Sequence, residues 1–132
     1  MRIALPISLA AASILAGCAQ SPTQRQEADR RALTEARPVG EPVDCIELTR
    51  IDYTRVRDSR TVDFYMRGRE VYRNRLRSEC SGLAFEDSFT YRTSLGRLCS
   101  VDVITVNRSG GGGPSGPTCA LGAFQRIETR IR

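Results

Sequence analysis

The sequence of 132 residues contains no histidine, no lysine and no tryptophan. Without histidine the chain cannot form a Ser-His or Cys-His nucleophile pair, or a zinc site that uses imidazole. Without lysine it has neither a Schiff-base amine nor the lysine of a phosphate-binding P-loop. Every one of the 20 basic residues is therefore an arginine, and with 15 acidic residues the formal net charge is +5.

The N-terminal segment has the features of an export signal. Arg2 supplies a positive charge, and the apolar run from Ile3 to Ile14 is too short to span a bilayer. The next four residues, Leu15-Ala16-Gly17-Cys18, resemble the lipobox of bacterial lipoproteins. An ordinary secretory signal with an unrelated cysteine is the alternative, and it leaves the position and flanking residues of Cys18 unexplained.

The lipobox resemblance has consequences for processing and location. It implies that residues 1–17 are a cleaved signal peptide and that Cys18 carries lipid. Ala19 stands where an aspartate often retains lipoproteins in the inner membrane. By the same resemblance we expect a lipid-anchored outer-membrane protein whose domain faces the periplasm, with the inner membrane as the less favoured location.

Residues 18–44 have the composition of a tether. They contain no aromatic residue, few large aliphatic residues and three prolines. Such a segment buries too little apolar surface to offset its ordering entropy. Residues 24–36 are good helix formers without an apolar face, so at most a loose helical turn or two is expected. We therefore predict a lipidated N-terminus with a flexible tether over 18–44, and a folded domain over 45–132.

The predicted domain contains six short segments rich in β-branched and aromatic residues. In one of them Val62, Phe64 and Met66 alternate onto a single face. The segments cover residues 45–55, 61–66, 70–76, 88–93, 98–107 and 119–127. The expected fold is mostly β: a small antiparallel barrel or roll of about six short strands, stapled by disulfides. The sequence does not choose between barrel and roll.

Four cysteines follow Cys18, and an exported chain with an even number of them predicts disulfides. A four-cysteine zinc site would need close pairs such as C-x₂-C, and the four are far apart, so we expect no metal. In a simple up-and-down meander, Cys45 and Cys99 fall at one end of the sheet and Cys80 and Cys119 at the other. The pairs Cys45–Cys99 and Cys80–Cys119 then fit disulfide geometry better than sequential pairing does, although connectivity stays open.

A wider pattern runs through the predicted domain. It comprises Cys45-Ile46, residues 58–64, 72–76, 80–83, 89–91 and 98–106, and Cys119 to Phe124. This pattern resembles a family of small proteobacterial envelope proteins of unknown function. The resemblance covers almost all of residues 45–124. It implies export and a four-cysteine design, and it implies no activity or binding residue.

Nine arginines lie between Arg50 and Arg77, with acidic residues interleaved. On strands such a pattern is typical of a solvated face with cross-strand charge pairs. The alternative is an anion-binding patch, for which Arg67, Arg69, Arg73 and Arg75 are the candidates, because guanidinium groups bind phosphate and carboxylate at two points. Nucleic acid is not expected as a partner, since no platform of aromatic residues and lysine accompanies the charge.

No residue is assigned a catalytic role. Gly110 to Gly116 lacks the G-K-[ST] of a phosphate-binding loop and is interpreted as a surface loop. Glu86, Asp87 and Asp102 are the carboxylates that glycan hydrolysis could use, but Asp102 is expected to face solvent or to bond a nearby loop amide.

The sequence therefore predicts a non-enzymatic, membrane-tethered envelope lipoprotein without a cofactor. We expect its domain to bind a protein partner. The alternative partner is an anionic envelope component such as lipopolysaccharide, anionic lipid or cell-wall polymer.

Overall fold

In the computed structural model, which describes residues 21–93, 95–110 and 114–129, the strands form three antiparallel sheets. The helices are α1 (Pro22–Glu35), α2 (Leu83–Glu86) and the short 3-10 helix η1 (Leu48–Arg50). The strands are β1 (Arg37–Pro38), β2 (Cys45–Glu47), β3 (Ile51–Val56), β4 (Thr61–Met66), β5 (Val71–Arg75), β6 (Phe89–Tyr91), β7 (Arg97–Cys99), β8 (Val103–Val106), β9 (Thr118–Ala120) and β10 (Phe124–Glu128).

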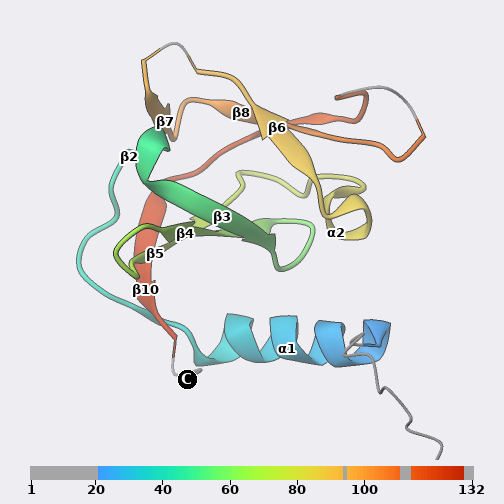
Figure 1. The fold of residues 1–132 in the computed structure, drawn as a ribbon, viewed down its shortest axis with the longest axis horizontal. Coiled ribbons are helices and arrows are strands. Elements are labelled where there is room, and N and C mark those ends of the chain that lie inside the picture. Colours follow the sequence, from blue (N-terminus) through green and yellow to red (C-terminus); the bar gives the residue numbers. More distant parts are fainter. Residues whose placement is uncertain (1–20, 94, 111–113, 130–132) are drawn as a thin grey trace, which may run out of the picture.

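The elements lie in three layers (Figure 1). The middle layer is a five-stranded sheet in the order β1-β10-β5-β4-β3. The pair β2-β7 and the sheet β6-β8-β9 lie over one face of it, and α1 lies along the other face. The molecule is thus a β roll with a helix packed on its outside.

The core lies between the five-stranded sheet and the two smaller sheets. Phe64 on β4 and Phe124 on β10 are fully buried and meet edge to face, with their ring centroids 5.5 Å apart. Leu98, Ile104 and Leu121 close the core from the opposite layer. The alternating apolar residues of β4 and the β-branched run of β8 thus point at each other, as half-buried strands require.

The prediction of a mostly β fold is confirmed, and the described residues form no closed barrel. The structure has ten strands where six are predicted, because three predicted strands are each broken into two (β2 with β3, β7 with β8, and β9 with β10) and because β1 lies before the predicted domain. At each break the chain passes from one sheet to another. A continuous strand cannot make such a corner without a bend, so the breaks are what turn a meander into a roll.

The corner between β9 and β10 depends on a glycine. The buried side-chain amide of Asn74 donates to the carbonyl oxygen of Gly122 at 2.7 Å, and its oxygen accepts from the amide of Gly122 at 2.9 Å. A Cβ atom on Gly122 would lie 2.2 Å from the carbonyl oxygen of Arg75. Any side chain at this position would therefore push β5 and the corner apart.

Two disulfides join Cys45 to Cys99 and Cys80 to Cys119, which is the pairing that the meander argument favours. The up-and-down order holds within β3-β4-β5 and within β6-β8-β9, but it fails between these two groups, because β5 pairs with β10 and β2 pairs with β7. Cys45 and Cys99 are direct cross-strand partners on β2 and β7. The pairing thus follows from a different topology than the one used to predict it.

The segment between Ser21 and Asp44 is structured, which differs from the flexible tether predicted over residues 18–44. Residues 22–35 form α1, and Arg37 and Pro38 pair with β10 as an edge strand. Ala32 is the one buried residue of α1, and the helix is held to the sheet mainly by the polar contacts of Arg57 and Arg73, which composition alone does not reveal. The predicted signal peptide (residues 1–17), the predicted lipobox and Cys18 lie outside the described residues.

Candidate functional site

The sheet face under α1 carries a buried ion cluster (the Asp63 cluster: Asp29, Arg57, Asp63, Tyr65 and Arg73). Asp63, on β4, is fully buried and accepts from both arginines. The Nε of Arg57 lies 2.9 Å from one carboxylate oxygen, and Arg73 binds both oxygens at 2.7 and 2.9 Å. Arg57 also donates to Asp29 on α1 and to the hydroxyl of Tyr65, both at 2.7 Å. Two cations and two carboxylates balance within the cluster.

Opposite charges are in direct contact within this cluster, so each ion has a partner of the other sign. Burial lowers the pKa of Arg57, but the hydrogen bonds to Asp29 and Asp63 raise it by more, so its pKa lies above the ordinary value. A buried carboxylate with two guanidinium partners likewise has its oxygens satisfied. The cluster is therefore a structural joint between α1 and the sheet.

Arg73 also holds the C-terminal end of α1. One of its terminal nitrogens lies 3.2 Å from the carbonyl oxygen of Ala32 and the other 3.5 Å from that of Leu33. These carbonyls belong to the last turn of the helix, where no further amide follows to bond them. A cation at this end also complements the helix dipole. Arg73 thus serves as the C-terminal cap of α1.

This arrangement corrects the place of Arg73 in both interpretations of the arginine-rich strands, although Arg73 does form a cross-strand charge pair with Asp63. Arg73 is buried, so it belongs neither to a solvated face nor to an anion-binding patch. Arg67 and Arg69 are exposed in the turn between β4 and β5, and Arg75 is exposed at the far end of β5. The four candidate residues Arg67, Arg69, Arg73 and Arg75 therefore do not form one patch.

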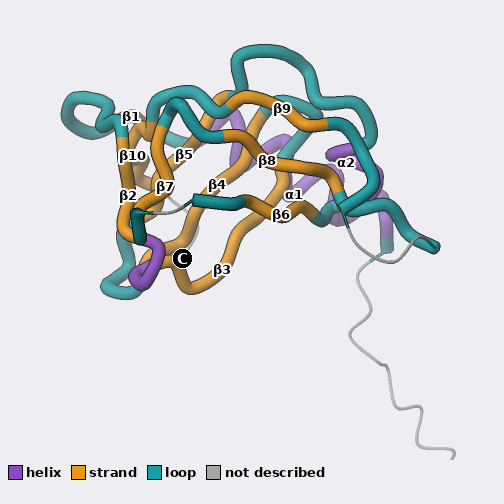
Figure 2. Tube along the Cα trace, turned by 90° about the horizontal axis from the view of Figure 1, so that it is seen from above, coloured by secondary structure: helices purple, strands orange, loops and turns teal. Residues whose placement is uncertain are grey.

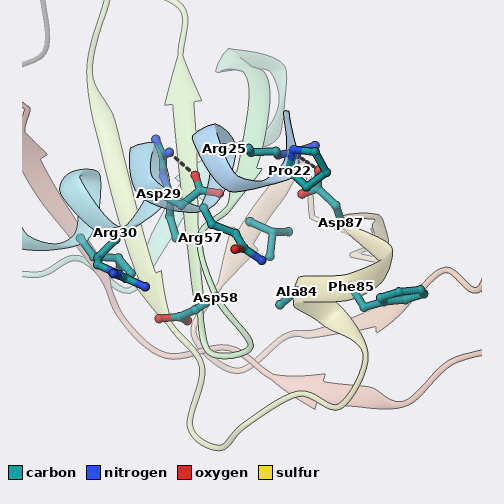
Figure 3. A pocket seen from close by; sticks show the side chains of 12 residues that line it. Pro22, Arg25, Asp29, Arg30, Arg57, Asp58, Ala84, Phe85 and Asp87 are labelled. Carbon is teal, nitrogen blue, oxygen red and sulfur yellow. Dashed lines mark hydrogen bonds and ion pairs between the residues drawn. The ribbon is translucent and has the colours of Figure 1, made fainter. Parts of the chain in front are cut away.

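A cleft of about 720 Å³ lies between α1, α2 and the end of β3 (Figure 3). Its walls are Pro22, Arg25, Gln26, Asp29, Arg30, Leu33, Val56, Arg57, Asp58, Ala84, Phe85 and Asp87. Arg25 on α1 forms an ion pair with Asp87, and Arg57 is engaged by Asp29. The side chain of Phe85 is 87% exposed. The lining of the cleft therefore combines paired charged side chains with one exposed aromatic ring, that of Phe85.

The carboxylates considered for hydrolysis all have partners. Glu86 accepts from the hydroxyl and the amide of Ser109, and these bonds hold its pKa below the usual value. Asp87 is paired with Arg25. Asp102 accepts from the amide of Cys99 at 2.7 Å, which is the loop-amide bond expected for it. Their visible contacts fix α2 and the turn after β7.

A second surface feature surrounds β7 at the opposite end of the molecule from α2 (Figure 2). Leu95 and Val101 are 80% and 81% exposed, and both line a depression of about 450 Å³ beside Cys99. Isolated exposed apolar residues are common, whereas these two lie together in one hollow. We call this feature the β7 surface. The sequence did not reveal this surface, because Leu95 lies in a predicted turn and Val101 in a predicted strand, and nothing in either segment indicates that the two side chains are exposed together.

A third feature is a hollow of about 510 Å³ at the edge formed by β1, β10 and the β4–β5 turn. Three exposed arginines line it, namely Arg37, Arg69 and Arg126, with Glu70 and Glu128 beside them. Only Arg69 was among the predicted anion-binding residues. The other two come from segments distant in sequence, which only the folded sheet brings together.

Within residues 21–93, 95–110 and 114–129, no group of histidine, cysteine and acidic residues could hold a metal ion. No helix in this described part of the chain is both long and apolar enough to cross a membrane.

The sequence profile of a family of unknown function, DUF6491, matches residues 1–130. No curated protein and no solved structure matches the chain.

Proposed function

The chain belongs to the DUF6491 family, whose function is unknown, so its role has to be inferred from its own residues, and we propose that it is a lipid-anchored envelope lipoprotein whose β domain binds a protein partner. The anchor is Cys18, the leader is removed before it, and the membrane is the outer membrane with the domain in the periplasm. The domain acts by binding, without a catalytic residue or cofactor.

The β7 surface carries the proposal of a protein partner. Two strongly exposed apolar side chains in one hollow match the apolar centre of a protein interface better than they match a site for a polar ligand. The Cys45–Cys99 disulfide and the Asp102 bond to Cys99 hold this surface rigid. A rigid surface loses little conformational entropy on binding.

The anchor is tested at Cys18. We expect mass spectrometry of the membrane-extracted protein to find an N-terminus at residue 18 that carries acyl chains. Cys18→Ala should abolish both the acylation and the cleavage, and the chain should accumulate as the precursor. Ala19→Ser is the matched control and should be processed normally, whereas Ala19→Asp should move the acylated protein to the inner membrane fraction. A wild-type chain without acyl groups would refute the anchor.

The partner surface is tested by photo-cross-linking in living cells. A photoreactive residue at Val101 should yield one dominant adduct with another envelope protein, and the adduct should persist at high salt because the contact is apolar. The same photoreactive residue at Arg55, exposed on β3, serves as the control and should give no such adduct. Absence of a protein adduct from Val101 would contradict the proposal.

The hollow lined by Arg37, Arg69 and Arg126 favours a second candidate function, the binding of an anionic envelope component. Three guanidinium groups from three elements suit the phosphates of lipopolysaccharide or anionic lipids and the carboxylates of cell-wall polymers. Such binding would weaken as salt rises, because exposed charges are screened. That salt dependence separates it from binding at the β7 surface.

A further inference from the structure

Only a short piece of chain separates Cys18 from the folded domain. Ser21 is the N-cap of α1: its hydroxyl accepts from the amide of Gln24, and the side chain of Gln24 accepts from the amide of Ser21. Three residues of extended chain span at most about 10 Å. An acyl group on Cys18 would therefore hold the first turn of α1 close to the lipid headgroups.

The first turn of α1 lies next to α2. Arg25, one turn into α1, forms an ion pair with Asp87, the residue that follows α2, and Pro22 and Phe85 line the same cleft. Figures 1 and 2 show α2 and the beginning of α1 at the same end of the molecule, away from β7. Whatever membrane Cys18 enters is thus within reach of α2 as well.

α2 presents Phe85 outward and cannot turn it inward. Leu83 of the same helix is fully buried in the core, and Glu86 is fixed by two hydrogen bonds from Ser109. The residues before and after the helix, Gly82 and Asp87, have left-handed backbone conformations that set its two ends. Because these contacts fix the orientation of α2, Phe85 remains 87% exposed.

We infer that Phe85 inserts into the interfacial region of the bilayer that anchors Cys18, so that the domain has a fixed orientation on the membrane. The inference rests on the proposed lipid anchor and adds a second contact to it. Aromatic side chains favour the boundary between headgroups and acyl chains, and shallow insertion there reaches about 5–10 Å. Two points of attachment restrict rotation in a way that a single anchor does not. The β7 surface would then point away from the membrane, toward the periplasm.

The chain itself offers the probe, because it contains no tryptophan. Phe85→Trp places a single indole at the proposed contact, and Val101→Trp places one on the β7 surface as the matched control. Each mature protein, acylated and processed in cells and then purified, is incorporated into vesicles of phosphatidylethanolamine and phosphatidylglycerol with brominated acyl chains. Bromine quenches only an indole that enters the lipid. We expect the Phe85→Trp protein to lose most of its indole emission and to shift to shorter wavelength, and the Val101→Trp protein to do neither.

The outcomes separate the inference from the anchor. If the Phe85→Trp protein is acylated and floats with the vesicles but its indole is not quenched, the anchor stands and the contact of Phe85 with lipid is refuted. An indole emission from this variant that is shifted to shorter wavelength but unquenched would place the ring against protein, either a partner or a second copy, and would also refute it. A chain without acyl groups overturns both proposals.

Discussion

Replacing Asp63 by asparagine is expected to lower the free energy of unfolding by about 3–5 kcal/mol, because it leaves the buried Arg73 without a carboxylate partner and the half-buried Arg57 with Asp29 alone. Asparagine keeps the shape of the side chain, so the loss reports the missing charge and not a cavity. One of its two terminal groups would also present N–H donors to guanidinium groups that only donate. Urea unfolding of the full chain, followed by circular dichroism, measures the change.

Asp52→Asn is the matched control for this substitution. Asp52 lies on β3 of the same sheet and is exposed, so its replacement should change stability by no more than about 0.5 kcal/mol. If Asp63→Asn behaved like Asp52→Asn, the cluster would be solvated and α1 would not cover it.

The cluster should also show strong coupling between its members. Arg73→Met removes one partner of Asp63 and also the cap on the last turn of α1. Each single variant breaks the ion pair between Asp63 and Arg73, so the sum of the two single losses counts that interaction twice. The double variant Asp63→Asn/Arg73→Met breaks it once, and its loss of stability should be smaller than the sum by about 0.5–3 kcal/mol. Simple additivity would mean that the two residues act independently.

The sequence predicts the elements whose stability is local. The alternation of Val62, Phe64 and Met66 predicts β4 with the bounds that the structure has, Thr61–Met66. The β-branched run of residues 101–106 predicts β8, but its first residues form the turn held by Asp102. Side-chain periodicity identifies a strand well, whereas the residue at which it leaves one sheet for another depends on contacts made elsewhere.

The helix α1 shows where composition misleads. The position at which the helix begins can be predicted from the sequence, because Ser21 and Gln24 form a capping box with Pro22 at the first helical position. The way it packs on the sheet could not be predicted, because Arg57 and Arg73 lie 28 and 41 residues beyond the helix residues that they bind. A polar helix without an apolar face is stabilised here by ion pairs, and hydropathy carries no information about their partners.

The candidate sites were predictable only in part, for the same reason. Glu86 and Asp87 stand out in the sequence as neighbouring acids, yet their partners Ser109 and Arg25 are remote. The exposure of Phe85 could not be predicted either, since an aromatic residue two positions after a leucine suggests burial. Which side chains remain exposed depends on how distant segments pack together, and local sequence patterns do not contain that information.

Replacing Cys80 and Cys119 together by alanine is expected to lower the free energy of unfolding by about 4 kcal/mol, because the bridge closes a loop with a sequence separation of 39. The same chain-entropy argument gives about 4 kcal/mol for Cys45–Cys99, with a separation of 54. Burial distinguishes the two. Cys80 is fully buried and Cys119 nearly so, within the core cluster, whereas Cys45 and Cys99 are partly exposed. The Cys80–Cys119 substitution therefore adds a loss of core packing.

The same difference in burial predicts the order of reduction. Thiol–disulfide exchange requires a thiolate to reach a sulfur atom, so in native conditions dithiothreitol should open Cys45–Cys99 before Cys80–Cys119. Alkylation of the freed thiols at successive times, followed by peptide mass spectrometry, reads out the order. In guanidinium chloride, which exposes both bridges, the two should be reduced at similar rates. If Cys80–Cys119 opened first in native conditions, the core around β9 would open more readily than the edge around β7, and the β7 surface would be the more rigid part of the domain.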